Sequence, residues 1–217
     1  MEQVTIGLIG LGSVGTGVAR LLTEQADRLA RRAGKRLRWK WAAVRDPGKS
    51  RGVQLDGVQV TTDVRRLLDD LEVDIVVELM GGIDPACSIV LDSLKSGKHV
   101  VTANKALLAE RGPEIFAQAR ASGRAVAFEA SVAGGIPIIQ ALGVSLAANQ
   151  ILNLAAILNG TCNYILTKMA LAGDLPTSTR ATLIGCVAST GVAAVSSSLS
   201  NSAPGPRGRC SSTGWSG

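Results

Sequence analysis

Three glycines near the amino terminus have the spacing of a phosphate-binding turn. Gly10, Gly12 and Gly15 form the pattern Gly-x-Gly-x-x-Gly, directly after the apolar segment 4–9 and at the start of a helical pattern. In this context the first glycine permits a tight turn, the second lets the backbone approach a pyrophosphate, and the third allows close packing of helix on strand. The helix N-terminus then offers N–H groups and a partial positive charge to the phosphates. The predicted cofactor-binding residues of this turn are Gly10, Gly12, Ser13, Val14 and Gly15; the alternative is a tight turn without a ligand.

A basic residue stands where a dinucleotide site selects between NAD and NADP. An NAD-specific site places Asp or Glu at the end of the second strand, where the carboxylate accepts from the ribose 2′-hydroxyl. This chain has Arg45 there, followed by Asp46. Because a guanidinium pairs with a 2′-phosphate, Arg45 favours NADP, with NAD as the alternative cofactor. A surface arginine without a ligand role is the other interpretation.

The segments around these residues alternate between strand and helix patterns, which is typical of an α/β fold with a doubly wound parallel sheet of Rossmann type. Such a sheet is buried on both faces, in keeping with a core of Val, Ile, Leu and Ala and 3% aromatic residues. The predicted strands are 4–9, 37–44, 58–61, 74–79, 99–102 and 125–129. The predicted helices run from the glycine turn to about residue 32 and over 64–71, 85–96, 113–122 and 138–146.

Composition points away from several other classes of protein. The net charge is +6, and its basic cluster at residues 28–45 lacks the aromatic platform of a nucleic-acid site, so we expect a solvated helix face and no nucleic acid. The four cysteines are far apart and form no metal-binding pair. We recognise no secretory signal and no apolar run of the ~20 residues that a membrane helix needs. These features predict a cytoplasmic protein without a membrane segment.

Three further segments resemble the signatures of homoserine dehydrogenases, in the family's order. They are His-Val-Val-Thr-Ala-Asn-Lys-Ala at 99–106, Phe-Glu-Ala-Ser-Val-Ala-Gly-Gly-Ile-Pro at 128–137 and Ile-Leu-Asn-Gly-Thr-Cys-Asn-Tyr-Ile-Leu-Thr at 157–167. The resemblance covers residues 1–170. It implies an oxidoreductase of threonine and methionine biosynthesis that interconverts L-homoserine and L-aspartate 4-semialdehyde with NAD(P), and it suggests a homodimer.

The resemblance also implies site residues. Thr102 and Lys105 are expected beside the nicotinamide and the substrate, with Lys105 as the catalytic residue. A lysine there either withdraws the hydroxyl proton as hydride leaves or, if it stays charged, stabilises the developing alkoxide. A monovalent cation such as sodium is expected at four positions, largely on backbone carbonyls; a plain loop between domains is the alternative. The four positions are Glu129, Val132, Gly134 and Ile136.

The resemblance stops before the family's pattern is complete. Residues 177–217 contain no Asp or Glu, 10 of the 41 are Ser, and no lysine follows Lys168. The family's substrate-binding glutamate and proton-transferring lysine therefore find no match. We predict an NAD(P)-binding domain at 1–132, part of an α+β catalytic and dimerisation domain at 133–176, and a disordered tail unlike the family at 177–217.

Three functional hypotheses remain at this stage. The first is an NADP-linked homoserine dehydrogenase impaired by the incomplete catalytic region. The second is a catalytically dead remnant that still binds NADP. The third is another Rossmann oxidoreductase that acts on a different small carbonyl compound.

Overall fold

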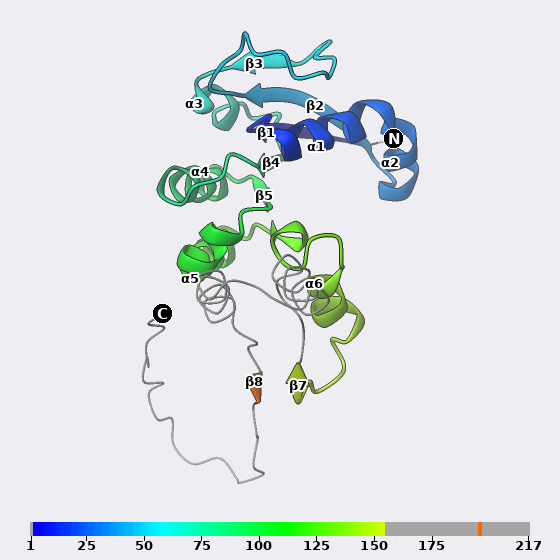
Figure 1. The fold of residues 1–217 in the computed structure, drawn as a ribbon, viewed down its shortest axis with the longest axis vertical. Coiled ribbons are helices and arrows are strands. Elements are labelled where there is room, and N and C mark those ends of the chain that lie inside the picture. The colour runs from blue at the N-terminus through cyan, green and yellow to red at the C-terminus, as the bar shows by residue number, and fades with distance from the viewer. Residues whose placement is uncertain (1, 155–194, 197–217) are drawn as a thin grey trace, which may run out of the picture. The chain divides into compact units, whose positions relative to one another are not determined.

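Six strands form one parallel sheet in the order β3-β2-β1-β4-β5-β6. The structure, a computed structural model, describes residues 2–154, 195 and 196. Figure 1 shows the helices arranged around this sheet. The strand order reverses beside β1, which is the arrangement of a doubly wound dinucleotide-binding sheet. The predicted fold class is confirmed. The strands are β1 Gln3–Ile9, β2 Arg36–Ala43, β3 Gln59–Thr61, β4 Ile75–Glu78, β5 His99–Thr102 and β6 Val126–Ala127.

Helices cover both faces because side chains alternate along each strand. On one face of β1, Leu8 is fully buried and clusters with Ala19 of α1. On the other face, Ile9 clusters with Leu67 of α3. Further along the sheet, Val100 of β5 packs with side chains of α4 and α5. The helices are α1 Ser13–Glu24, α2 Ala26–Ala33, α3 Val64–Leu68, α4 Asp84–Lys95 and α5 Lys105–Ser122.

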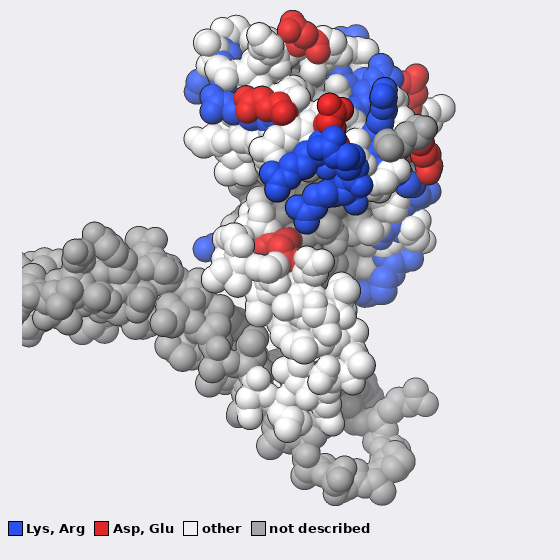
Figure 2. Space-filling model, turned by 90° about the vertical axis from the view of Figure 1, so that its right-hand side faces the viewer, with Lys and Arg blue, Asp and Glu red and all other residues white. Residues whose placement is uncertain are grey.

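The first predicted helix is in fact two helices. Gln25 leaves the helical conformation, with φ −118° and ψ 22°, and α2 starts at the next residue. The continuous prediction was wrong because α2 has no buried residue to continue the apolar stripe of α1. Its arginines Arg28, Arg31 and Arg32 are exposed. Figure 2 shows Lys and Arg side chains gathered on the face that carries α2. Exposed basic side chains of this kind agree with the predicted solvated helix face.

The predicted starts and ends of two other helices also need correction. α5 begins at Lys105 rather than at Pro113, because Asn104 caps it by accepting a hydrogen bond from the Leu107 N–H at 3.1 Å. Pro113 lies inside this helix. α3 ends at Leu68 rather than at Leu71, whose side chain is 96% exposed.

β6 is shorter than predicted, and the segment after it turns back on itself. Glu129 was expected at the end of the strand, but it opens a 3-10 helix, η1 Glu129–Ser131. Its carboxylate accepts hydrogen bonds from the N–H groups of Ile139 and Gln140, both at 2.9 Å. These bonds hold the short helix α6 Ile138–Gln140 to the first compact unit, and the chain divides into its two units after Gln140. The predicted functional boundary at residue 132 stays a prediction.

The described part of the second unit is small. The helical pattern predicted for 138–146 continues from α6 into a π-helical turn, η2 Ala141–Ser145. β7 Asn153–Leu154 then pairs antiparallel with β8 Val195–Ser196. The third signature and the predicted disordered tail lie, apart from β8, outside the described residues. None of the helices in the described part of the chain has the length and apolar character that a membrane span requires.

A polar cluster ties β2 to the loop before β4. Lys40 Nζ lies 2.6 Å from an Asp70 carboxylate oxygen, and the Trp41 indole N–H donates to the same carboxylate at 2.6 Å. The Asp70 side chain is 14% exposed. Burial acts to raise the pKa of Asp70, but the hydrogen bonds from Lys40, Trp41 and the backbone outweigh it and lower the pKa from 3.8 to about 2. The cluster therefore stabilises the fold in its ionised form.

Candidate functional site

The glycine turn has the geometry that its sequence predicts. Gly10 has φ +96°, a conformation that favours glycine, and its N–H donates to the Ala43 carbonyl at 2.9 Å. A Cβ atom on Gly15 would lie 2.0 Å from the Gly10 carbonyl oxygen, so α1 packs directly against the turn. A Cβ atom on Gly12 would meet nothing within 4 Å. The turn is thus closed on the sheet side and open where a ligand would approach.

The N-terminus of α1 is available to an anion. Gly12 is the N-cap residue, so no capping side chain engages the first N–H groups of the helix. The first turn contains no acidic residue. Ser13 and Val14 open the helix, and Val14 is 58% exposed although it is apolar. The first helical turn therefore presents N–H donors and the positive end of the helix dipole to a phosphate.

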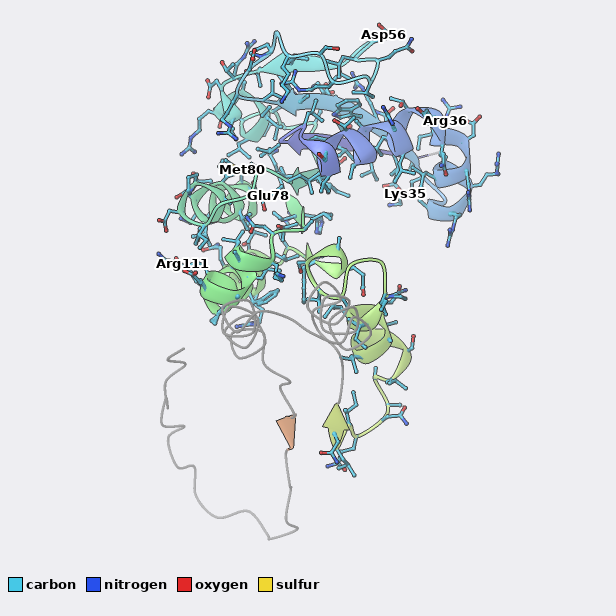
Figure 3. All side chains as sticks on the ribbon, viewed as in Figure 1. Lys35, Arg36, Asp56, Glu78, Met80 and Arg111 are labelled. Atoms are coloured by element: carbon cyan, nitrogen blue, oxygen red, sulfur yellow. The ribbon has the colours of Figure 1, made fainter. Side chains whose placement is uncertain are left out.

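A cavity of about 510 Å³ adjoins this turn. It lies at the carboxyl ends of the strands around β1 and β4, where open α/β sheets bind their ligands. Figure 3 shows Met80, one of its lining residues, following Glu78 at the end of β4. The cavity is lined by Ile9, Gly10, Leu11, Gly12, Ala43, Val44, Arg45, Asp46, Lys49, Arg51, Thr62, Val64, Leu79 and Met80.

The basic side of the cavity is a braced loop. Arg51 donates to the carbonyl oxygens of Lys49, at 2.6 Å, and of Asp46. Its Nε atom is buried and has no hydrogen-bond partner among the described residues. The Asp46 carboxylate accepts a hydrogen bond from the Gly48 N–H at 2.9 Å, so it stabilises the turn to which it belongs. Arg45, Lys49 and Arg51 thus line the cavity with three cationic side chains, beside one acidic residue held by a local bond.

A buried polar network lies at the next strand end along the sheet. Thr102 is 1% exposed, and its hydroxyl donates to the Glu78 carboxylate at 2.6 Å. The Asn104 N–H donates to the same hydroxyl at 3.0 Å. Lys105 follows as the first residue of α5; it is exposed and forms no hydrogen bond with the described residues. The Thr102 side chain is therefore engaged within the protein, whereas the Lys105 amine faces solvent.

The segment predicted to hold a monovalent cation is a tight loop. Ala133 and Gly134 have φ +56° and +60°. The Ile136 carbonyl accepts from the Ile138 N–H at 2.8 Å, and the Glu129 carbonyl accepts from Val132 N–H at 3.2 Å. Within the described residues, no group of three His, Cys, Asp or Glu side chains could hold a metal ion. A cation here would depend on the backbone, and the site stays a prediction.

Comparison with known proteins identifies the family. Residues 10–129 match the family model for the homoserine dehydrogenase NAD-binding domain, and residues 137–184 match the model for homoserine dehydrogenase. The chain belongs to the homoserine dehydrogenase family. Its resemblance to that family is confirmed, and the first model supports a nicotinamide cofactor.

Individual homoserine dehydrogenases align with most of this chain. The enzyme of Pseudomonas aeruginosa is 46% identical over 173 residues, and that of Bacillus subtilis is 43% identical over 169. The crystal structure of a homoserine dehydrogenase from Thiobacillus denitrificans superposes with a TM-score of 0.73 at 50% identity and covers 78% of this chain. This chain spans 39% of the length of each of these three relatives. The match to the second family model continues to residue 184, into the segment expected to depart from the family after residue 176.

The structure gathers some of the predicted site residues and separates others. Gly10, Gly12 and Arg45 line one cavity, while Ser13, Val14 and Gly15 form the helix start beside it. Thr102 and Lys105 lie at the end of β5 and are not among the residues that line the cavity. The predicted cation positions Glu129, Val132, Gly134 and Ile136 lie in and after η1.

The sequence did not predict two features of the site, the buried Glu78 and the hydrogen bonds of Arg51. Glu78 lies at the end of an apolar strand and is fully buried, which is unusual for an acidic residue. A carboxylate in an otherwise apolar buried strand was the available signal. Arg51 braces the basic loop, but nothing in the local sequence distinguishes it from the other basic residues nearby.

Proposed function

We propose that this chain forms the NADP-binding part of a homoserine dehydrogenase, an enzyme that interconverts L-homoserine and L-aspartate 4-semialdehyde. The observation that carries this proposal is the open glycine turn and uncapped start of α1 beside a cavity lined by Arg45. The pyrophosphate would bind at Gly12 and the first N–H groups of α1. When bound, the cofactor would supply the chemistry of hydride transfer to and from the substrate's carbinol carbon.

The charges of the cavity support NADP over NAD. Arg45 stands at the end of β2, where a 2′-phosphate is recognised. The buried Arg51 Nε still has a donor to offer, and Lys49 adds a third positive charge. Asp46, which could accept from a 2′-hydroxyl, is bonded instead to Gly48.

Lys105 is the proposed catalytic residue. It starts α5, which follows β5, two strands along the sheet from β1 and the glycine turn, and this location supports a role beside the nicotinamide half of a dinucleotide. Its amine would withdraw the hydroxyl proton or stabilise the alkoxide as hydride leaves. Within the described residues, its amine forms no ion pair that would compete with this role.

A monovalent cation would bind on carbonyls in the loop at 132–136, beside Glu129. A homodimer and a cytoplasmic location are inferred from the family alone.

A second candidate, NADP binding without turnover, is favoured by the composition of residues 177–217, which contain no acidic residue to bind the substrate ammonium. Homoserine-dependent reduction of NADP, followed by the absorbance of the reduced nicotinamide, separates the two. Turnover that disappears in Lys105→Ala supports the enzyme. NADP that raises the melting temperature, with no turnover and no further stabilisation by homoserine, supports the binding role. A chain whose melting temperature does not respond to NADP contradicts both.

A further inference from the structure

Glu78 is a buried acidic residue whose two carboxylate oxygens both accept hydrogen bonds. Its exposed fraction is zero. One oxygen accepts from the N–H groups of Met80, at 2.9 Å, and Gly81, at 3.3 Å. The other accepts from the Thr102 hydroxyl at 2.6 Å. No Lys or Arg pairs with it among the described residues, so hydrogen bonds alone compensate the burial of this group.

The direction of the protons makes this arrangement specific. Thr102 uses its one hydroxyl proton to donate to Glu78, which leaves its oxygen to accept from the Asn104 N–H at 3.0 Å. The chain of bonds therefore runs from Asn104 through Thr102 to Glu78. Each donor in this network faces an acceptor. If one group is replaced so that it no longer donates or accepts as before, its neighbour loses a hydrogen bond.

The network joins two loops at the carboxyl edge of the sheet. Glu78 fixes the loop after β4 through Met80 and Gly81, and Thr102 fixes the loop after β5. On the outside, the Asn104 side-chain amide donates to the Gly82 carbonyl at 2.7 Å, and its oxygen caps α5. α5 starts at Lys105, so the position of that residue depends on the same set of bonds.

We propose that Glu78 is a positioning residue for the nicotinamide half of the site, holding the β4–α4 and β5–α5 loops in one fixed arrangement. This inference rests on the proposed NADP-binding function. The two loops follow β4 and β5, on the opposite side of β1 from Arg45, and therefore on the half of the sheet that faces the nicotinamide. A side chain needed for packing alone would be apolar here, as Val76 and Val77 before it are.

Glu78→Gln tests the role at nearly constant volume. If the amide oxygen keeps the bonds from Met80 and Gly81, the amide nitrogen faces Thr102, and the hydroxyl proton loses its acceptor. Thr102→Val removes the same link from the other side, and Thr102→Ser restores the hydroxyl as the rescue variant. Each protein is titrated with NADPH, observed by nicotinamide fluorescence, and with 2′-phospho-ADP-ribose, which contains the adenine half and lacks the nicotinamide.

We expect Glu78→Gln and Thr102→Val to bind NADPH roughly tenfold more weakly, the effect of losing about one buried hydrogen bond. Both should change the nicotinamide emission and keep the affinity of the wild-type chain for 2′-phospho-ADP-ribose, and Thr102→Ser should recover most of the NADPH affinity that Thr102→Val loses. Unchanged NADPH binding in both variants overturns the positioning role, and an equal loss for both ligands overturns it in favour of a general structural role. If the wild-type chain binds neither ligand, the proposed NADP function itself fails, and the role of Glu78 fails with it.

Discussion

Gly15 is the position where adding a single methyl group should do most damage to the cofactor half of the fold. A Cβ atom there would lie 2.0 Å from the Gly10 carbonyl oxygen and 2.9 Å from its carbon. Packed heavy atoms keep about 3.5 Å, so in Gly15→Ala the start of α1 has to move away from the turn by about 1.5 Å. The neighbouring atoms are backbone, and neither can rotate aside.

The size of the effect follows from two opposing contributions. Overpacking of this kind costs about 1–3 kcal/mol, and a clash with backbone belongs at the upper end. Alanine returns up to about 1 kcal/mol through its higher helix propensity. The net loss of about 2 kcal/mol corresponds to a fall in melting temperature of about 4–8 °C for a protein of this size.

Gly17 provides the matched control on the same helix. A Cβ atom at Gly17 would meet nothing within 4 Å, so Gly17→Ala should gain helix propensity without a clash and melt about 1–4 °C higher. Both variants would be compared by thermal unfolding followed by circular dichroism, with and without NADP. Gly15→Ala should also respond less to NADP, since the shifted helix carries the N–H groups that we propose bind the phosphates. Equal melting temperatures for the two variants would refute the close packing of α1 on the turn.

Two further predictions test the binding surface and the charge network. Gly12→Val should keep the wild-type melting temperature within about 2 °C, because its side chain enters open space. It should nevertheless weaken NADPH binding by about tenfold or more in a fluorescence titration. Unaltered binding would mean that the pyrophosphate binds elsewhere. Asp70→Asn should lower the free energy of unfolding at pH 7 by about 1–2 kcal/mol in urea titrations, allowing for partial solvent screening of the pair with Lys40. Because the pKa of Asp70 in the folded chain lies below its ordinary value, the difference in unfolding free energy between the two proteins should shrink as the pH falls below about 4 and nearly vanish near pH 2. A difference that stays constant with pH would contradict the proposed ionisation of Asp70.

Much of the fold follows from the sequence because a buried parallel sheet leaves a strong periodic signal. Apolar segments such as β1 and β4 alternate with helices and end in turn residues, which predicts the strand positions to within a few residues. The predictions failed where a local signal competed with the pattern. Pro113 resembles a helix start, but the Asn104 cap determines where α5 begins. The break at Gln25 has no glycine or proline to mark it.

The geometry of the candidate site was predictable where it depends on residue type and spacing. Gly10 and Gly15 are positions where the structure requires glycine, Gly12 faces open space, and Arg45 lines the cavity after β2. The network of Glu78 and Thr102 was not predictable in this way, because it depends on the register that places β4 beside β5. That register pairs Glu78 with Thr102, which are 24 residues apart in the chain.

The most direct test of the central claim is the binding of NADPH and NADH to the wild-type chain, Arg45→Ala and Arg28→Ala, measured by isothermal titration calorimetry. Arg28 is an exposed arginine of α2, so Arg28→Ala removes the same charge away from the cavity. We predict that the wild-type chain prefers NADPH, and that Arg45→Ala loses about tenfold or more in NADPH affinity while its NADH affinity changes by less than about twofold. Arg28→Ala should bind both as the wild-type chain does. Equal wild-type affinities for the two cofactors, or an equal loss of both in Arg45→Ala, would contradict an NADP site built around Arg45.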